Sequence, residues 1–205
     1  MMKSSVNFLV SFALMAFTNF AMAEVAPDAL VKSTAEDVLA VVKKDKDIQS
    51  GDQQKIFALA EEKILPNFDF DRVCRMVLGK HWNSASKEQQ ESFQREFRSL
   101  MLRTYASALS KYRNQTIEYK PFRAQAGDSE VTVKTQILQP GGQPIGVDYS
   151  LVKKGDTWKV FDIVIEGVSL VTNYRGQFNN EIRQSGIDGL IQKLAEKNKG
   201  ANKAS

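Results

Sequence analysis

The sequence is poor in the residues that build disulfides and metal clusters. Among its 205 residues there is a single cysteine, Cys74, and a single histidine, His81. A lone thiol excludes an intramolecular disulfide, even in an oxidising compartment. One residue of each type also cannot assemble a Cys/His metal cluster, so no metal site is expected. Burial of apolar side chains must therefore stabilise the fold without covalent or metal cross-links.

The sequence also lacks the short motifs that mark common active sites. It has no Gly-x-Ser-x-Gly turn, no Gly-rich phosphate loop and no His-Glu-x-x-His pair. Cys74 and His81 are seven residues apart, a spacing that would place a nucleophile and a base on one helix face. Gly79 lies between them and is expected to end that helix. We therefore interpret Cys74 as a core thiol and predict no catalytic residues and no cofactor.

Asp162 is the strongest candidate for a catalytic carboxylate, because its neighbours along the strand are β-branched and aromatic. The alternative is a structural carboxylate that forms hydrogen bonds near Ser169 or Asn173, and this is the favoured interpretation. Asp69 and Asp71 are interpreted as helix caps.

Charge is nearly balanced, which excludes some partners. The chain has 28 Lys and Arg against 24 Asp and Glu, a formal net charge of +4. The excess is spread along the sequence and forms no basic cluster of the kind that binds nucleic acid. It fits transient contact with an anionic membrane surface or an acidic partner.

Residues 1–23 have the features of a cleavable signal peptide. Lys3 gives a positive start, residues 6–17 are apolar, and an Ala-x-Ala motif ends at Ala23. The apolar run is too short to span a bilayer comfortably. We predict cleavage after Ala23 and export as a soluble protein of 182 residues (205 − 23).

Helical patterns fill the first half of the mature chain. Pro27 suits the first position of one helix, and Asp52 can cap another. A short helix over residues 72–78 ends at Gly79. Residues 86–89, Ser-Lys-Glu-Gln, form a capping box that opens the longest helix.

Strand patterns follow, and then the helical period returns. Four strands are predicted as an antiparallel meander, at residues 116–121, 130–138, 145–151 and 157–165. After Gly167, apolar residues recur every three or four positions from Val168 to Phe178, which indicates a helix. A last helix follows the break at Ser185-Gly186.

The order of elements predicts an α+β fold. Helices should pack on one face of a curved four-stranded antiparallel sheet, forming a cone that can enclose an apolar cavity. We place one domain at residues 24–198 and expect the polar end to fray from Asn198, with a flexible tail over residues 199–205.

A family resemblance adds to this interpretation. Residues 158–178 read W-K-V-F-D-I-x-I-E-G-V-S-L-V-x-N-Y-R-x-x-F, residues 70–82 read F-D-R-V-x-x-x-V-L-G-K-x-W, and residues 186–191 read G-I-D-G-L-I. These long ungapped runs resemble the MlaC/toluene-tolerance family of periplasmic phospholipid-transport proteins. Most of the mature chain shares the likeness, although the helices before Pro66 match only in pattern.

The resemblance implies an NTF2-like cone whose deep pocket holds the acyl chains of a phospholipid as cargo. Such a protein would carry lipid between the outer and inner membranes and so maintain outer-membrane lipid asymmetry. Its expected partners are an outer-membrane lipoprotein–porin complex and an inner-membrane ABC transporter with a periplasmic substrate-binding ring. Asp162, Gly167 and Ser169 match the family motif and are interpreted as architectural.

The pocket residues are predicted from the apolar faces of the elements. The candidates are Leu100, Met101, Tyr105 and Leu109 on the long helix, Val133, Val147, Tyr149, Leu151, Val160 and Ile163 on the sheet, and Val168, Val171 and Phe178 on the following helix. A shift of one residue would exchange the strand faces. Lys80, Arg98 and Arg175 are candidates for contact with a phosphate or an acidic partner, although solvated surface charge is favoured for each.

Two other functions stay open from the residues alone. An NTF2-like enzyme for a small apolar substrate would use Asp162 inside the pocket. A periplasmic chaperone or adaptor would present its apolar surface as an open groove and would hold no lipid.

Overall fold

The computed structural model describes residues 25–112, 114–125 and 127–201. The predicted signal peptide therefore lies outside the described residues. Within these ranges, no helix combines the length and the apolar character that crossing a membrane requires.

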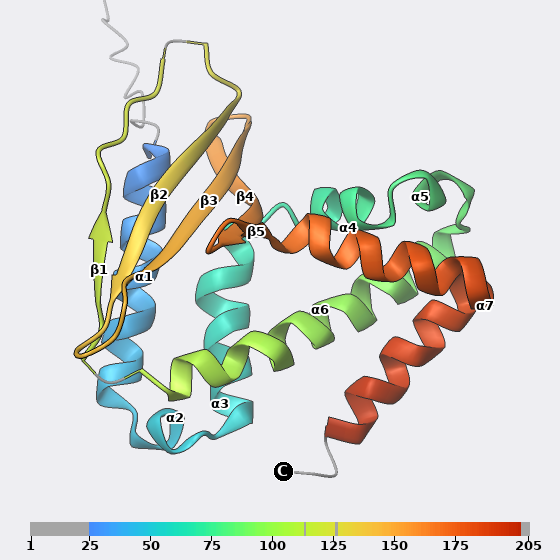
Figure 1. Cartoon of the computed structure of the whole chain (residues 1–205), viewed down its shortest axis with the longest axis horizontal. Coiled ribbons are helices and arrows are strands. Elements are labelled where there is room, and N and C mark those ends of the chain that lie inside the picture. Colours follow the sequence, from blue (N-terminus) through green and yellow to red (C-terminus); the bar gives the residue numbers. More distant parts are fainter. Residues whose placement is uncertain (1–24, 113, 126, 202–205) are drawn as a thin grey trace, which may run out of the picture.

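Short and long helices form the first half of the chain (Figure 1). In order they are α1 (Pro27–Lys44), α2 (Lys46–Ser50), α3 (Gln53–Leu59), the π-helical turn η1 (Ala60–Ile64), the 3₁₀ turn η2 (Leu65–Asn67), α4 (Phe70–Leu78), α5 (Lys80–Ser84) and α6 (Lys87–Ser110). The strands are β1 (Thr116–Tyr119), β2 (Glu130–Leu138), β3 (Ile145–Lys154), β4 (Thr157–Ile165) and β5 (Val168–Ser169), and α7 (Leu170–Ala201) follows.

The caps predicted at Asp52, Asp69 and Ser86 are confirmed by hydrogen bonds, whereas the cap predicted at Asp71 was wrong, because Asp71 lies inside α4 and pairs with Arg75. The carboxylate of Asp52 accepts from the Lys55 backbone N–H at 3.0 Å, and that of Asp69 accepts from Arg72 N–H at 3.2 Å. Ser86 and Gln89 exchange backbone-to-side-chain hydrogen bonds, the reciprocal pattern of a capping box. The sequence signals therefore set where α3, α4 and α6 begin.

The sheet has five antiparallel strands in the order β1-β2-β3-β4-β5, one more than predicted. The additional strand exists because Glu166 and Gly167 both have positive φ, 49° and 79°. Such residues form the tight two-residue turns that close hairpins. The chain therefore reverses after β4 and pairs Ile165 with Val168 before α7 begins. Val168 is a strand residue, and its assignment to the helix was wrong.

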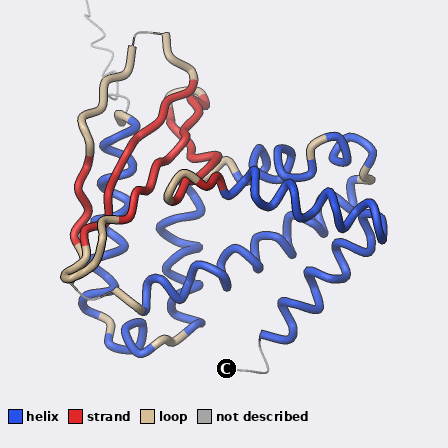
Figure 2. The backbone as a smooth tube through the Cα atoms, in the orientation of Figure 1, coloured by secondary structure: helices blue, strands red, loops and turns tan. Residues whose placement is uncertain are grey.

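One face of the sheet is apolar and the other is exposed to solvent. Val133 lies opposite Tyr149, and residues opposite one another point to the same face. This face packs against Val31 of α1. Figure 2 shows α1 behind the strands, which are drawn in red. The other face carries exposed polar side chains such as Lys134. A register shift at Ser150/Leu151 inserts Phe161 as an extra residue, and such bulges increase the bend of a sheet.

A second core forms where α4, α6 and α7 meet. Phe97 stands at its centre, with ring centroids 5.4 Å from Phe93, 5.2 Å from Tyr174 and 5.3 Å from Phe178. The Phe93 ring is stacked on Phe97 and the other two meet it edge-to-face, and both geometries add to the free energy of area burial. Cys74 is fully buried in this core, as predicted, and burial raises the pKa of its thiol. His81 instead contacts Asn179 at 3.0 Å, so the two are not a catalytic pair.

The last helix folds back on the molecule. Gly186 interrupts α7 with φ 71° and ψ −179°, and the second arm returns along α6 (Figure 1). The helix continues through Asn198 to Ala201, beyond the point where fraying was expected, and residues 202–205 of the expected tail lie outside the described residues. Asn198 is 7% exposed, and its amide group donates to the backbone oxygen and the carboxylate of Glu96. These bonds fix the arm to α6.

Gly186 and Gly176 provide a matched test of this bend. Gly186→Ala should lower the free energy of unfolding by roughly 1–3 kcal/mol, because its φ and ψ lie in a region that is essentially restricted to glycine. Gly176 lies in the regular part of the same helix, with open space where a Cβ would be. Gly176→Ala should therefore raise the free energy of unfolding by about 0.5–1 kcal/mol. Urea unfolding measures both. Equal effects of the two substitutions would contradict the bend.

Candidate functional site

An apolar cavity of about 590 Å³ lies between the two cores. Its walls come from α1, the η1–η2–α4 segment, α6, the strands β1 to β4 and the first turns of α7. Almost every wall residue is aliphatic or aromatic. A concave, mostly apolar space of this size is typical of ligand-binding sites.

Most of the predicted pocket residues line this cavity. They are Met101, Tyr105 and Leu109 of α6, Val147, Tyr149, Val160 and Ile163 of the sheet, and Val171 of α7. The predicted strand face is therefore the one that faces the cavity.

The other predicted residues lie elsewhere. Leu100 and Phe178 belong to the aromatic core, because one helical step from Met101 turns Leu100 toward α7. Leu151 shares the face of Tyr149 but lies further along β3, and Val133 lies opposite Tyr149 on β2. Both are buried in the core that contains Trp158 and Val31 of α1. Val168 is 55% exposed on β5.

Several wall residues were missed by the sequence analysis. Helix α1 contributes a full apolar stripe, and the turn between η1 and α4 contributes another part of the wall. The main ones are Leu30, Val31, Ala35, Val38, Leu39, Ile64, Leu65, Phe68, Phe70, Val73 and Val77. The stripe on α1 was visible as a helical period, but nothing in the pattern stated which element it would face.

Asp162 is held by three hydrogen bonds at the junction of sheet and helix. It accepts from Ser169 Oγ at 2.5 Å, from Val171 N–H at 3.1 Å and from Ile163 N–H at 2.9 Å. Ser169 Oγ in turn accepts from Thr172 N–H at 3.0 Å. The predicted bond to Ser169 is confirmed. The carboxylate caps the first turn of α7 and so sets the angle at which this helix closes the cavity.

Two phenol groups of the cavity wall are held in their neutral form. Burial raises the pKa of Tyr149 to about 12. Burial, with Tyr174 beside it, also raises the pKa of Tyr105. The neutral forms of these side chains suit an apolar ligand.

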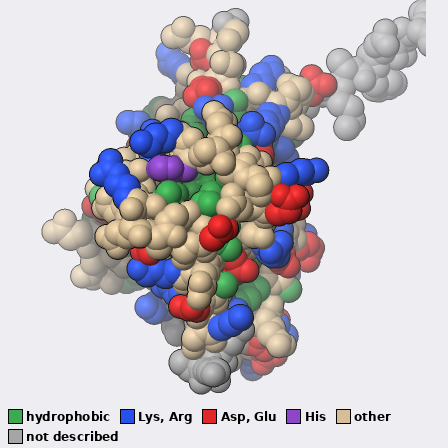
Figure 3. Space-filling model, turned by 90° about the vertical axis from the view of Figure 1, so that its right-hand side faces the viewer, with side chains coloured by type: hydrophobic (Ala, Val, Ile, Leu, Met, Phe, Trp, Pro, Cys, Tyr) green, Lys and Arg blue, Asp and Glu red, His purple; other side chains and the backbone are tan. Residues whose placement is uncertain are grey.

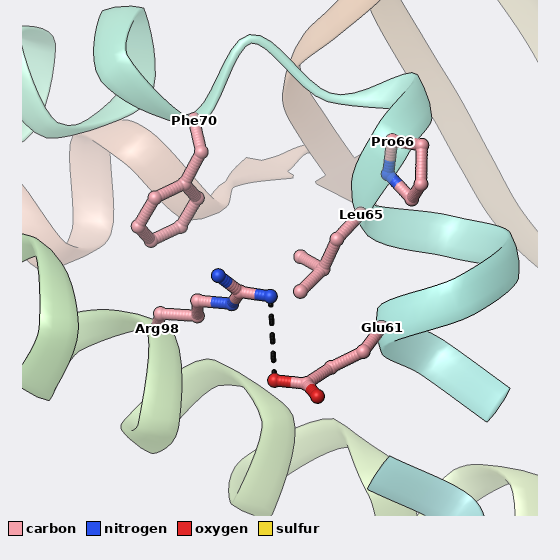
Figure 4. Close-up of a pocket in the computed structure, with 5 residues that line it drawn as sticks. All are labelled: Glu61, Leu65, Pro66, Phe70 and Arg98. Carbon is pink, nitrogen blue, oxygen red and sulfur yellow. Dashed lines mark hydrogen bonds and ion pairs between the residues drawn. The ribbon is translucent and has the colours of Figure 1, made fainter. Parts of the chain in front are cut away.

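A smaller hollow of about 290 Å³ lies on the other side of the wall formed by Leu65 and Phe70 (Figure 4). Arg98 of α6 reaches across it and pairs with Glu61 of η1, at 3.3 Å between Nη2 and Oε1. Both side chains are about half exposed, so this pair contributes up to about 1 kcal/mol. Arg98 thus has a carboxylate partner already.

The other two candidate cations do not line the cavity. The guanidinium of Arg175 packs over Gly79, with Nε 3.2 Å from the position that a Cβ would take there. Lys80 is exposed at the start of α5. Figure 3 shows this end of the molecule, where basic side chains are interspersed with acidic and neutral ones.

A profile described as MlaC protein matches residues 32–196, most of the chain. The chain belongs to the MlaC family. The family resemblance drawn from the sequence is therefore confirmed.

Relatives in this family cover nearly the whole chain. The intermembrane phospholipid transport system binding protein MlaC of Haemophilus influenzae is 28% identical over 193 residues, which are 92% of this chain and 90% of that protein. The toluene tolerance protein ttg2D of Pseudomonas putida is 25% identical over 196 residues, with coverage of 92% and 91%.

A solved structure of the same fold contains a ligand. The phospholipid-binding protein from Ralstonia solanacearum, determined in complex with a phospholipid, superposes with a TM-score of 0.80 and 43% identity. The match covers 84% of this chain and 97% of that chain. The α+β class is confirmed by this match.

Asp162→Ala separates an architectural role from a catalytic one. Loss of the three hydrogen bonds should lower the free energy of unfolding by about 1–3 kcal/mol, measured by urea unfolding. Ser169→Ala removes one of these hydrogen-bond partners and should lower the free energy of unfolding by a smaller amount. An unchanged free energy of unfolding, together with loss of turnover of an added lipid ester, would instead support the enzyme alternative.

Proposed function

We propose that this protein is a soluble periplasmic carrier that binds the acyl chains of a phospholipid in the cavity between α6 and the sheet. It shuttles lipid between the outer and inner membranes and thereby maintains the lipid asymmetry of the outer membrane. The observation that best supports this proposal is the apolar cavity, in a chain of the MlaC family whose relative was solved with a phospholipid.

The energetics explain why such a cavity is needed. Exposing acyl chains to water costs about 0.8 kcal/mol per CH₂, so two chains of ~15 methylenes cost roughly 24 kcal/mol. A carrier must replace most of this with contacts to apolar side chains. Contacts much stronger than this would prevent release of the lipid to an acceptor membrane.

The proposal requires binding and release but no bond-breaking step. Asp162 is engaged in hydrogen bonds to the backbone and to Ser169, which leaves it poorly placed as a general base. We therefore propose that the protein is not an enzyme, and that the lipid is cargo and not a cofactor.

We propose the same partners that the resemblance implied. At the outer membrane the carrier would meet a lipoprotein–porin complex, and at the inner membrane an ABC transporter with its periplasmic substrate-binding ring. Transient contact with the membrane surface itself would be assisted by the small positive net charge.

Mass spectrometry of the protein purified from the periplasm tests the carrier function. Native spectra should show the chain without residues 1–23 and carrying about one molar equivalent of diacyl phospholipid, which solvent extraction then releases. A lipid-free protein that also takes no lipid from vesicles would overturn the carrier function and favour an adaptor.

Two adjacent residues of α6 separate binding from stability. Met101→Trp adds volume on the cavity side and should lower the ratio of loaded to empty protein about tenfold, which corresponds to about 1.4 kcal/mol. Leu100→Ala removes volume from the aromatic core and should cost about 2–5 kcal/mol of unfolding free energy while lipid loading is retained.

Native mass spectrometry and urea unfolding measure the two effects on the same preparations. Loss of loading in both variants, or in neither, would show that the cavity wall has been assigned to the wrong residues.

A further inference from the structure

The helical segment between α3 and α4 changes its pitch twice where it passes the cavity. The Leu65 N–H donates to the carbonyl of Ala60, five residues earlier, which is the wide pattern of the π turn η1. The Phe68 N–H donates to the Leu65 carbonyl at 3.0 Å, which is the tight pattern of η2. Pro66 between them has no N–H with which to continue an α-helical ladder. The backbone around Leu65 is therefore a natural hinge, because regular hydrogen bonding is interrupted on both sides of it.

The wall of the cavity is thin beside this hinge. Leu65 and Phe70 line both the cavity and the surface hollow of about 290 Å³, so these two side chains separate the two spaces. Phe70 is anchored, with its ring centroid 5.8 Å from that of Phe97 in the aromatic core. Leu65 is only partly buried and belongs to none of the three apolar cores found among the described residues. Leu65 can therefore move without disturbing a core.

An ion pair spans the hollow outside this wall. Arg98 of α6 and Glu61 of η1 meet at 3.3 Å between Nη2 and Oε1, below Leu65 and Phe70 in Figure 4. The pair ties the hinge segment to α6, so Leu65 stays over the cavity while the pair is intact. A half-exposed ion pair contributes little free energy. Such a latch holds weakly and opens reversibly.

A second arginine lies one step further along the same two helices. Glu61 faces Arg98, and Phe57, four residues earlier, faces Arg103, whose Cζ lies 5.4 Å from the ring centroid of Phe57. The Nε and Nη1 atoms of Arg103 are buried and have no hydrogen-bond acceptor within the described residues. Buried donors without an acceptor cost free energy. A movement of η1 that carries Glu61 toward Arg103 would supply an acceptor as the pair with Arg98 breaks.

We propose that Leu65 closes a lateral opening in the cavity wall, through which an acyl chain of the cargo enters and leaves. Arg98 holds Glu61 in the closed state, and Arg103 receives the same carboxylate in the open state. This inference rests on the proposed carrier function, and it adds a route for the lipid and a control over the rate of exchange.

The opening would solve a kinetic problem of a carrier. An acyl chain that leaves a closed apolar cavity must otherwise exchange all its contacts for water at once. The hollow offers apolar contacts on the way out, from Leu65, Pro66 and Phe70. The latch should change how fast lipid is exchanged. It should leave the amount bound at equilibrium nearly unchanged, because the closed cavity is the same with or without the latch.

The two arginines give opposite predictions. Protein loaded with deuterated phosphatidylethanolamine is mixed with an excess of unlabelled phosphatidylethanolamine–phosphatidylglycerol vesicles, and native mass spectrometry follows the loss of label. Arg98→Met frees Glu61 and should raise the rate of loss by about two- to fivefold, whereas Arg103→Met removes the open-state partner and should lower the rate by a similar factor. Methionine keeps an apolar stem in place of the arginine stem at both positions.

Loss of positive charge alone cannot produce opposite signs. Lys87→Met is the matched control, because Lys87 is an exposed residue at the start of α6 whose ion pair with Glu91 spans no hollow. Weaker attraction to anionic vesicles would slow all three variants alike. Changes of the same sign in Arg98→Met and Arg103→Met would overturn the opening. A loss of equilibrium loading in Arg98→Met would show that Arg98 binds lipid and would also overturn the latch.

A covalent lock tests the route itself. Glu61→Cys combined with Arg98→Cys places a thiol on each side of the hollow, and a short bifunctional maleimide joins them, while Cys74 is fully buried and stays unmodified. The linked protein should lose labelled lipid about fivefold more slowly than the same variant treated with a monofunctional maleimide. Equal rates in the linked and unlinked forms would show that lipid leaves elsewhere.

The same preparations separate this proposal from the carrier function. Mass spectrometry before mixing shows whether the labelled phospholipid is bound. An unsubstituted protein that takes up no labelled phospholipid would overturn the carrier function itself. A loaded protein whose release is unaffected by the lock would overturn only the lateral opening.

Discussion

Two separate apolar cores flank the cavity and determine the rest of this structure, beside a third formed by α1, α2 and α3. One is the stack of rings around Phe97 between α4, α6 and α7, and the other is the face of the sheet that carries Val133 and Leu151 under α1. Close packing normally fills the interior of a domain to crystal-like density. Here the two cores are each well filled, and the space between them is left as an apolar cavity. The side chains that line an unfilled apolar cavity lack van der Waals contacts on one side. An acyl chain bound in the cavity supplies contacts that the polypeptide itself does not.

The connection between the two cores is a polar joint. Asp162 belongs to β4, yet its carboxylate accepts from Ser169 and from the first turn of α7. The tight turn at Glu166-Gly167 brings these groups within reach. Because the joint fixes where α7 leaves the sheet, it sets the separation of the cores and therefore the width of the cavity. The volume of the cavity thus depends on the carboxylate that joins the sheet to α7.

The sequence predicted the elements that have a strong local signal. Strands β2 and β4 begin and end where alternation and turn residues indicated, and the caps at Asp52, Asp69 and Ser86 were correct. The two-residue strand β5 was missed because no periodicity exists over two residues. The arm beyond Gly186 was predicted too short because Asn198 is polar, and its bonds to Glu96 depend on a helix 102 residues earlier in the chain.

Prediction of the cavity wall was limited by a different cause. Periodicity identifies an apolar face, but it does not show whether that face meets another side chain or an empty space. Tyr149 and Leu151 point the same way along β3, yet the first lines the cavity and the second is packed under Trp158. The difference comes from α1, whose position over the sheet is a tertiary contact without a local signature. The contribution of α1 to the wall was unpredictable for the same reason.

The central claim is that acyl chains occupy the space between the aromatic core and the sheet. An experimental structure of the protein purified with its native lipid tests this claim most directly. We predict continuous acyl-chain density between Met101 of α6 and Tyr149 of β3, with both cores unchanged. Lipid density on an outer surface, with the cavity closed by movement of α1 or α7 onto the sheet, would contradict the account.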